Sequence, residues 1–190
     1  MNWLGDEAGI DWSRASLDSL SVRAKRGGEQ TGPNPVDRGE RGSKYHDVVD
    51  RNGVPLAVRL SGANVHDSKL LEPLIDAIPP VVGPRGRPGR PRFRPAKLHA
   101  DKAHDSSEKR RALRARGITP RIARRGIEPK ERLGQYRWIV ERSLAWLVGH
   151  RRLGVRYERR SDIVRALLHP ACALICVRVL RRAELAVLDP

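Results

Sequence analysis

Aromatic residues and cysteines are scarce in this 190-residue chain, and each scarcity excludes something. One Phe, three Tyr and four Trp leave few rings for stacking on bases, which argues against an RNA-binding or single-strand-binding protein. Cys172 and Cys176 lie four apart in an apolar stretch, so we expect small buried side chains there and no disulfide framework. A metal site that includes His169 is the weaker alternative, because no fourth ligand lies nearby.

Long apolar runs are missing as well. No stretch of eighteen or more apolar residues occurs, and the longest one, around 166–180, is interrupted by a histidine, a proline and an arginine. The first dozen residues contain three acidic side chains and no apolar segment, so no signal peptide is predicted. We therefore expect a cytoplasmic protein, associated with the bacterial nucleoid and not with a membrane.

Positive charge is abundant. The chain has 38 Lys and Arg against 22 Asp and Glu, a formal net charge of +16. Such a charge favours polyanionic partners, and nucleic acid comes first because neutralised phosphates release counterions. An anionic membrane surface is the second candidate. The length suits one real core and is short for two full domains.

Five strands are predicted. Residues 15–24 alternate in polarity, 45–50 and 54–60 flank an Asn52-Gly53 turn typical of a hairpin, and 96–101 and 118–123 are short apolar runs. Pro55 and Pro120 suit edge strands, because proline donates no ladder hydrogen bond. These positions predict the strand order 3-2-1-4-5, with the first and fourth strands adjacent at the centre.

Helical patterns separate and follow these strands. We expect a helix over 67–78 that starts late or kinks because of Pro73, one over 106–116 ended by Gly117, one over 135–150, and one over 162–185. Asp67 is interpreted as a helix cap. The resulting fold class is α/β, a mixed five-stranded sheet with helices on both faces.

Residues 83–95 form a basic segment rich in Pro and Gly, which prevents a packed element there. Its arginines would repel one another without a counter-charge, so we favour an arm lying on a nucleic-acid backbone over a solvated linker. The arginines are Arg85, Arg87, Arg90, Arg92 and Arg94.

Three carboxylates are candidates for one site. Asp18 lies in the first strand, Asp101 ends the fourth, and Glu141 stands in the 135–150 helix, which is apolar nearly all round. Carboxylates that converge in a polyanion-binding protein need a cation between them, and hard oxygen ligands suit two Mg²⁺ or Mn²⁺ ions. The alternative is a plain ion pair of Glu141 with Arg137. Trp138 and Trp146 are interpreted as core residues.

Four blocks of sequence resemble, in order and spacing, the DDE transposases of bacterial insertion sequences, in the insertion-sequence-five family. They are LDSLSVRAKRGGEQTGPNPVDRGERGSKYH, GVPLAVRLSGANVHDSKLLEPLIDAI, LHADKAHDSSEKRRALRARGITPRIARRG and YRWIVERSLAWLVGHRRLGVRYERR. The resemblance implies a ribonuclease-H-like fold, and a double-stranded DNA substrate that is nicked and then joined to target DNA. It also implies catalytic, metal-binding roles for Asp18, Asp101 and Glu141.

The same resemblance implies that Tyr136 and Arg137 contact DNA or orient Glu141. The chain departs from the family at Ala103 and His104, where a glycine and an aromatic residue are usual, and at Val148, where a related group has lysine. In this chain the role of that lysine would fall to a basic residue shortly after Val148, namely His150, Arg151 or Arg152.

The resemblance also bears on domain organisation. We expect an N-terminal remnant at 1–13, a catalytic domain at 14–160 with a basic Pro/Arg insertion at 79–95, and a C-terminal helical extension at 161–190. Family members work as homo-oligomers on DNA, and an upstream-frame N-terminal polypeptide is a possible partner. The alternatives are a truncated remnant that only binds DNA and an RNA-associated basic protein.

Overall fold

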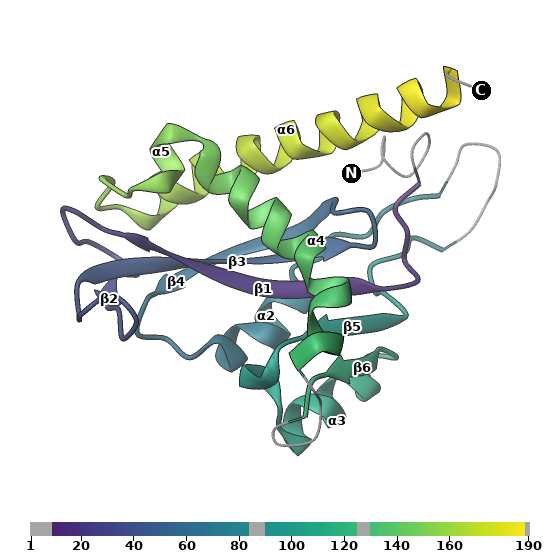
Figure 1. The fold of residues 1–190 in the computed structure, drawn as a ribbon, viewed down its shortest axis with the longest axis horizontal. Coiled ribbons are helices and arrows are strands. Elements are labelled where there is room, and N and C mark those ends of the chain that lie inside the picture. The colour runs from purple at the N-terminus through teal and green to yellow at the C-terminus, as the bar shows by residue number, and fades with distance from the viewer. Residues whose placement is uncertain (1–8, 84–89, 125–129, 189–190) are drawn as a thin grey trace.

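One mixed sheet organises the molecule, seen in a computed structural model that describes residues 9–83, 90–124 and 130–188, without the side chains of 130–137 and 183–188 (Figure 1). Its strands are β1 (Ala15–Arg23), β2 (Gly32–Pro33), β3 (Arg41–Asp50), β4 (Pro55–Gly62), β5 (Lys97–Ala100) and β6 (Thr119–Ile122). The sheet therefore has six strands and not five. The additional strand, β2, is a two-residue pairing with the start of β3.

The five longer strands lie in the order β4-β3-β1-β5-β6. β1, β3 and β4 pair antiparallel, whereas β5 runs parallel to both β1 and β6. This is the predicted order 3-2-1-4-5, so that prediction is confirmed. Pro55 and Pro120 lie in the two edge strands, where a missing N–H leaves no ladder bond unmade.

Helices cover both faces of the sheet, as predicted (Figure 1). One face carries the short 3₁₀ helix η1 (Asp67–Leu70), α2 (Leu71–Asp76) and α3 (Ser107–Ala115), while η2 (Lys102–His104) follows β5. The other face carries α4 (Lys130–Gly149), α5 (Arg151–Gly154) and α6 (Ser161–Leu188).

Local signals account for several boundaries. Gly53 has a φ of +89° in the β3–β4 turn, a conformation that favours glycine. The Ser106 side chain accepts a hydrogen bond from the Lys109 N–H and so caps α3, and Gly117 with a φ of +73° follows that helix. Pro73 lies in the first turn of α2, where no intrahelical N–H bond is lost, so the helix does start late.

Two apolar clusters hold these layers together. The first includes Leu17, Val48, Leu74, Leu98 and Leu113, from β1, β3 and β5 and from the α2 and α3 side. The second joins the other face of the sheet to α4, α5 and α6, and its residues include Val22, Tyr45, Val140, Leu144, Leu147, Leu153, Val164, Leu168 and Ile175. The amino-terminal half of α6 thus helps to form the core that also holds α4.

The α6 helix also contains a segment that is long and apolar enough to span a membrane by length and composition alone. This segment is Ser161–Arg182, with a mean hydropathy of 1.9 over its best window. The sequence still has no uninterrupted run of eighteen apolar residues, because His169, Pro170 and Arg178 interrupt this segment. Core helices pass the same test, and α6 packs on the sheet through Val164, Leu168 and Ile175.

Candidate active site

Asp18 and Asp101 lie on the two adjacent central strands. β1 and β5 pair in parallel, with Ala15 opposite Leu98 and Ser16 opposite His99. Continuing this register by two residues brings Asp18 opposite Asp101, which follows the last residue of β5. Both side chains are partly exposed. The sheet therefore places two carboxylates 83 positions apart in the sequence at neighbouring strand positions.

Asp18 projects from the face of the sheet that α4 covers. It is the antiparallel partner of Asp47 on β3, and directly opposed residues of such a pair project on the same side. Asp47 accepts a 2.7 Å hydrogen bond from the hydroxyl of Ser143 on α4. This bond fixes which face α4 covers, and α4 also contacts β5.

Glu141 is exposed on α4, so the expectation of a carboxylate held among apolar neighbours was wrong. The buried stripe of the helix is formed by Val140, Ser143, Leu144 and Leu147. At 3.6 residues per turn, Glu141 lies on one flank of this stripe and Ile139 on the other. Ile139 lies near Gly53 in the β3–β4 turn, which places the Glu141 flank on the side away from that turn.

Asp101 is held by its local backbone. Its Oδ1 accepts a 2.9 Å hydrogen bond from the Ala103 N–H and so caps η2, and the same oxygen lies 3.8 Å from Nε2 of the buried His104. Burial lowers the pKa of His104, while the charges of Asp101, Asp67 and Asp18 oppose that shift. The imidazole is therefore close enough to sense all three carboxylates. Sequence reasoning treated His104 only as a departure from the family pattern.

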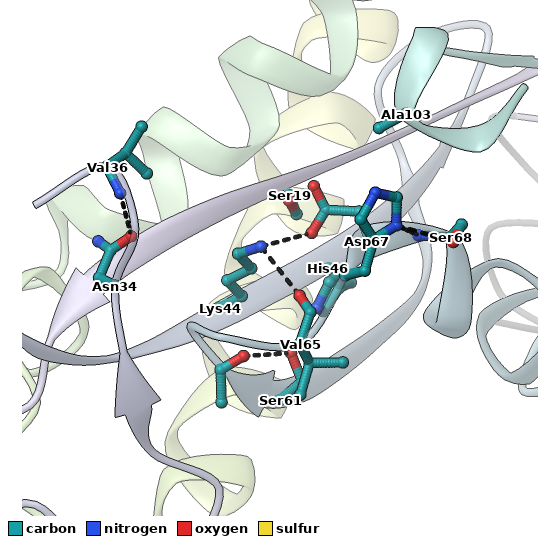
Figure 2. A network of polar contacts seen from close by, with 12 residues as sticks. Ser19, Asn34, Val36, Lys44, His46, Ser61, Val65, Asp67, Ser68 and Ala103 are labelled. Atoms are coloured by element: carbon teal, nitrogen blue, oxygen red, sulfur yellow. Dashed lines mark hydrogen bonds and ion pairs between the residues drawn. The ribbon is translucent and has the colours of Figure 1, made fainter. Parts of the chain in front are cut away.

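Asp67 belongs to a second polar network (Figure 2). By strand register its partner Lys44 projects from the opposite face of the sheet from Asp18. Lys44 Nζ lies 2.9 Å from Asp67 Oδ1 and donates to the Val65 carbonyl as well. Burial raises the pKa of Asp67, but the hydrogen bond and charge of Lys44 outweigh it, so the pKa lies below its usual value. Asp67 is not the cap of η1, because the capping side chain is that of His66.

Lys44 gave no signal in the sequence, because its role depends on the pairing of β1 with β3. Ser21 is its strand partner, and Ser19 pairs with His46 two positions along. Alternate residues project on opposite faces, so these side chains turn toward Asp67 while Asp18 turns toward α4. Only the strand register reveals this division.

The predicted DNA-contacting residues have different surroundings. Arg85 and Arg87 lie outside the described residues, as do the side chains of Tyr136 and Arg137. Arg94 donates to the Ile75 carbonyl and to Asp76, and Arg92 lies over the Trp12 ring at 5.8 Å, so both lie against the body of the protein. The exposed ones are Arg90, Arg92, Arg151 and Arg152, of which Arg152 pairs with Glu158.

The prediction of core residues is wrong for Trp138, whereas Trp146 packs against the second apolar cluster. Trp138 is 50% exposed and Trp146 is partly buried. The Arg142 guanidinium lies between them, 4.8 Å from the Trp138 ring and 4.9 Å from the Trp146 ring. Trp138 therefore faces Arg142 on the outer side of the helix, whereas Trp146 faces it at the edge of the second apolar cluster.

The carboxylates must also be tested as metal ligands. Among the residues that the structure describes, no three His, Cys, Asp or Glu side chains lie close enough to hold one ion, and this includes the alternative with Cys172, Cys176 and His169. Mg²⁺, however, is usually bound by one or two carboxylates, with waters and substrate phosphates completing its six oxygen ligands. A pair formed by Asp18 and Asp101 fits that donor set, whereas Glu141 does not complete a group of three with them in the described structure.

Comparison with known proteins gives a consistent result. The profile of the family described as "Transposase DDE domain" matches residues 13–176. A protein of Burkholderia cepacia, named as a candidate transposase for insertion sequence element IS402, is 55% identical over 178 residues, which cover 93% of this chain and 83% of that protein.

A transposase for insertion sequence element IS1106 from Neisseria meningitidis serogroup B is 25% identical over 155 residues, which cover 75% of this chain and 48% of that protein. The mixed sheet with Asp18 and Asp101 on its central strands agrees with the ribonuclease-H-like fold of DDE domains. The chain therefore belongs to the DDE transposase family.

Proposed function

We propose that this chain catalyses the metal-dependent cleavage and rejoining of DNA phosphodiester bonds that moves an insertion sequence. Asp18, Asp101 and Glu141 are the proposed catalytic residues and ligands of two Mg²⁺ or Mn²⁺ ions. The observation that carries this proposal is the parallel register of β1 and β5, which brings Asp18 opposite Asp101.

The position of α4 supports the third ligand. α4 covers the face from which Asp18 projects, and Glu141 lies on the flank opposite to the one near the β3–β4 turn. Since β5 lies on the far side of β1 from β3 and β4, that flank faces the β1–β5 side. This side of α4 supports Glu141 as the proposed third ligand.

Two hydrogen bonds position these carboxylates. The Ala103 N–H orients the Asp101 carboxylate, and the Ser143–Asp47 bond fixes α4, and with it Glu141, against β3. Divalent ions, when bound, activate water and stabilise charge on the attacking and leaving oxygens of a phosphodiester. In this scheme water first hydrolyses a phosphodiester and frees a 3′-hydroxyl, and that hydroxyl then displaces a 3′-oxygen in target DNA.

DNA is the polyanion that the net charge of +16 requires. Arg90, Arg92, Arg151 and Arg152 are the exposed candidates for phosphate contacts. A homo-oligomer on paired DNA ends, an upstream N-terminal polypeptide and association with the nucleoid stay predictions, as do the domain boundaries at 13 and 160.

The experiment is a strand-nicking assay on duplexes that carry the ends of the insertion sequence, with and without Mg²⁺. We expect Mg²⁺-dependent nicking by the native chain and a loss of at least about a hundredfold in Asp18→Asn, Asp101→Asn and Glu141→Gln. Glu108→Gln is the matched control, since this carboxylate is exposed on α3 and belongs to neither network.

Two results would count against the proposal. Nicking that any one of the three substitutions leaves unchanged would remove that residue from the site. DNA binding by the native chain without any nicking would favour the DNA-binding remnant.

A further inference from the structure

Three arginines converge on one indole where α4 and α6 are in contact. The guanidinium carbons of Arg142, Arg178 and Arg182 lie 4.9, 5.1 and 5.6 Å from the centre of the Trp146 ring. Arg142 comes from α4, whereas the other two lie four residues apart on α6. We call these four residues the Trp146 cluster.

The cluster concentrates positive charge without a counter-ion among the side chains that the structure describes. No carboxylate of the described residues pairs with any of its arginines, although ion pairs are frequent elsewhere on the surface. Burial lowers the pKa of Arg142, and the charge of Arg182 lowers it further. Like charges four residues apart on a helix are destabilising, and cation–π contacts compensate only in part.

Hydrogen-bonding capacity is also left over. Arg142 donates through Nη2 to the Asn52 carbonyl at 2.9 Å, but its buried Nε has no partner among the described residues. Arg178 and Arg182 are exposed, and they form no hydrogen bond within the described residues. A guanidinium presents a planar fork of donors that matches an oxyanion with several acceptors.

We propose that the Trp146 cluster is a binding site for a phosphate of the DNA backbone, separate from the carboxylate site. Trp146 holds the guanidinium groups at a fixed spacing, and a phosphate that bridges them relieves their repulsion. Only the identity of the polyanion, DNA, rests on the function proposed above.

The position of the cluster suits a contact outside the reacting centre. Glu141 and Arg142 are consecutive on α4, so their side chains point about 100° apart around the helix axis. Arg142 also donates to the Asn52 carbonyl in the β3–β4 turn, so DNA held at the cluster lies on the flank of α4 opposite to Glu141. One duplex can then be anchored at the cluster while its strand lies at the site of cleavage.

The test compares two double variants of the full chain with equal charge. Arg178→Gln/Arg182→Gln removes two arginines of the cluster, and Arg165→Gln/Arg181→Gln removes two exposed arginines of the same helix that face no indole in the described structure. Binding of a fluorescent 20-base-pair duplex is measured by anisotropy in EDTA over a series of KCl concentrations.

We expect the cluster variant to bind at least about tenfold more weakly than the control variant near 100 mM salt. The slope of log affinity against log salt should fall by about one for each lost phosphate contact. Arg182→Lys keeps the charge but loses the planar fork, and it should lie between the native chain and the double variant. Equal affinities and slopes for the two double variants would overturn the proposal.

Measurement in EDTA separates this proposal from the catalytic one. If the cluster variant binds weakly but the native chain never nicks DNA, the cluster stands and the catalytic proposal fails. If both double variants bind alike while Glu141→Gln abolishes nicking, the cluster fails and the catalytic proposal stands.

Discussion

Asp47 should make the protein less stable as the pH rises, and Asp47→Asn should remove that dependence. The carboxyl is fully buried between β3 and α4, with the Ser143 hydroxyl on one oxygen and no partner for the other among the described residues. Burial raises its pKa from 3.8 to about 7, and the Ser143 and backbone hydrogen bonds only partly oppose this. Asp47 is therefore neutral in the folded protein below that pH.

The sign follows from which state binds the proton. Between pH 4 and 7 the unfolded chain loses the proton of Asp47 while the folded protein keeps it, so the free energy of unfolding falls as the pH rises. At 1.36 kcal/mol per pKa unit the full penalty above pH 7 is about 4 kcal/mol, of which about 3 kcal/mol develops between pH 5 and 8. Asparagine cannot ionise, so the variant escapes this penalty.

Urea unfolding of the native chain and Asp47→Asn at pH 5, 6, 7 and 8 measures the effect. The difference in unfolding free energy should shift by about 3 kcal/mol in favour of the variant from pH 5 to pH 8, whatever constant offset the amide introduces. The contributions of the other titrating groups cancel in this difference, because both proteins contain the same groups. Asp37→Asn is the control, since Arg23 holds the pKa of Asp37 below 3.8 and its difference should stay flat. A constant difference for Asp47→Asn would refute a neutral buried carboxyl.

Three further substitutions test other parts of the fold. Burial lowers the pKa of His46 from 6.5 to about 4. About 3 kcal/mol of the free energy of unfolding is therefore lost as the pH falls from 6.5 to 4, because only the unfolded chain binds the proton in that range. Acid unfolding of His46→Gln should lack this loss. Arg156 is buried and donates to three carbonyls and a hydroxyl. Arg156→Lys should therefore lower the free energy of unfolding, measured in urea, by about 3 kcal/mol. Arg152 is 71% exposed, so Arg152→Lys should lower it by less than about 0.5 kcal/mol. Gly28 has a φ of +117°, and a Cβ there would overlap the Arg159 backbone, so Gly28→Ala should lower thermal stability by at least about 2 kcal/mol.

The strand order could be predicted because its signals are local. Asn52-Gly53 specifies a tight turn, and Pro55 and Pro120 restrict two strands to the edges. β2 was missed because Gly32–Pro33 lies in a stretch rich in Gly and Pro, and its pairing with residues 41–42 is a tertiary contact. Nothing in its own sequence predicts a strand.

The surroundings of the site residues were less predictable for the same reason. Asp67 has the sequence context of a helix cap, but Lys44, 23 residues earlier, takes its carboxylate instead. Asp47 gave no signal of burial, since it stands in a strand between polar and apolar neighbours and becomes enclosed only when α4 packs on β3. Side chains that meet across a sheet depend on register, which a single sequence specifies only indirectly.

The apolar appearance of the 135–150 segment arises from two separate surfaces of one helix. Val140, Leu144 and Leu147 face the sheet and fix α4, whereas the half-exposed indole of Trp138 faces Arg142 on the outer side. A period-based interpretation counts both kinds as hydrophobic, so it predicts a helix buried nearly all round and makes Glu141 look anomalous. Once this indole is assigned to the outer side, the Glu141 carboxylate is no longer surrounded by apolar side chains. Because it is exposed, it pays no desolvation cost that a partner would have to offset. Its position on the flank toward β1 and β5 is then the feature that the nicking assay tests.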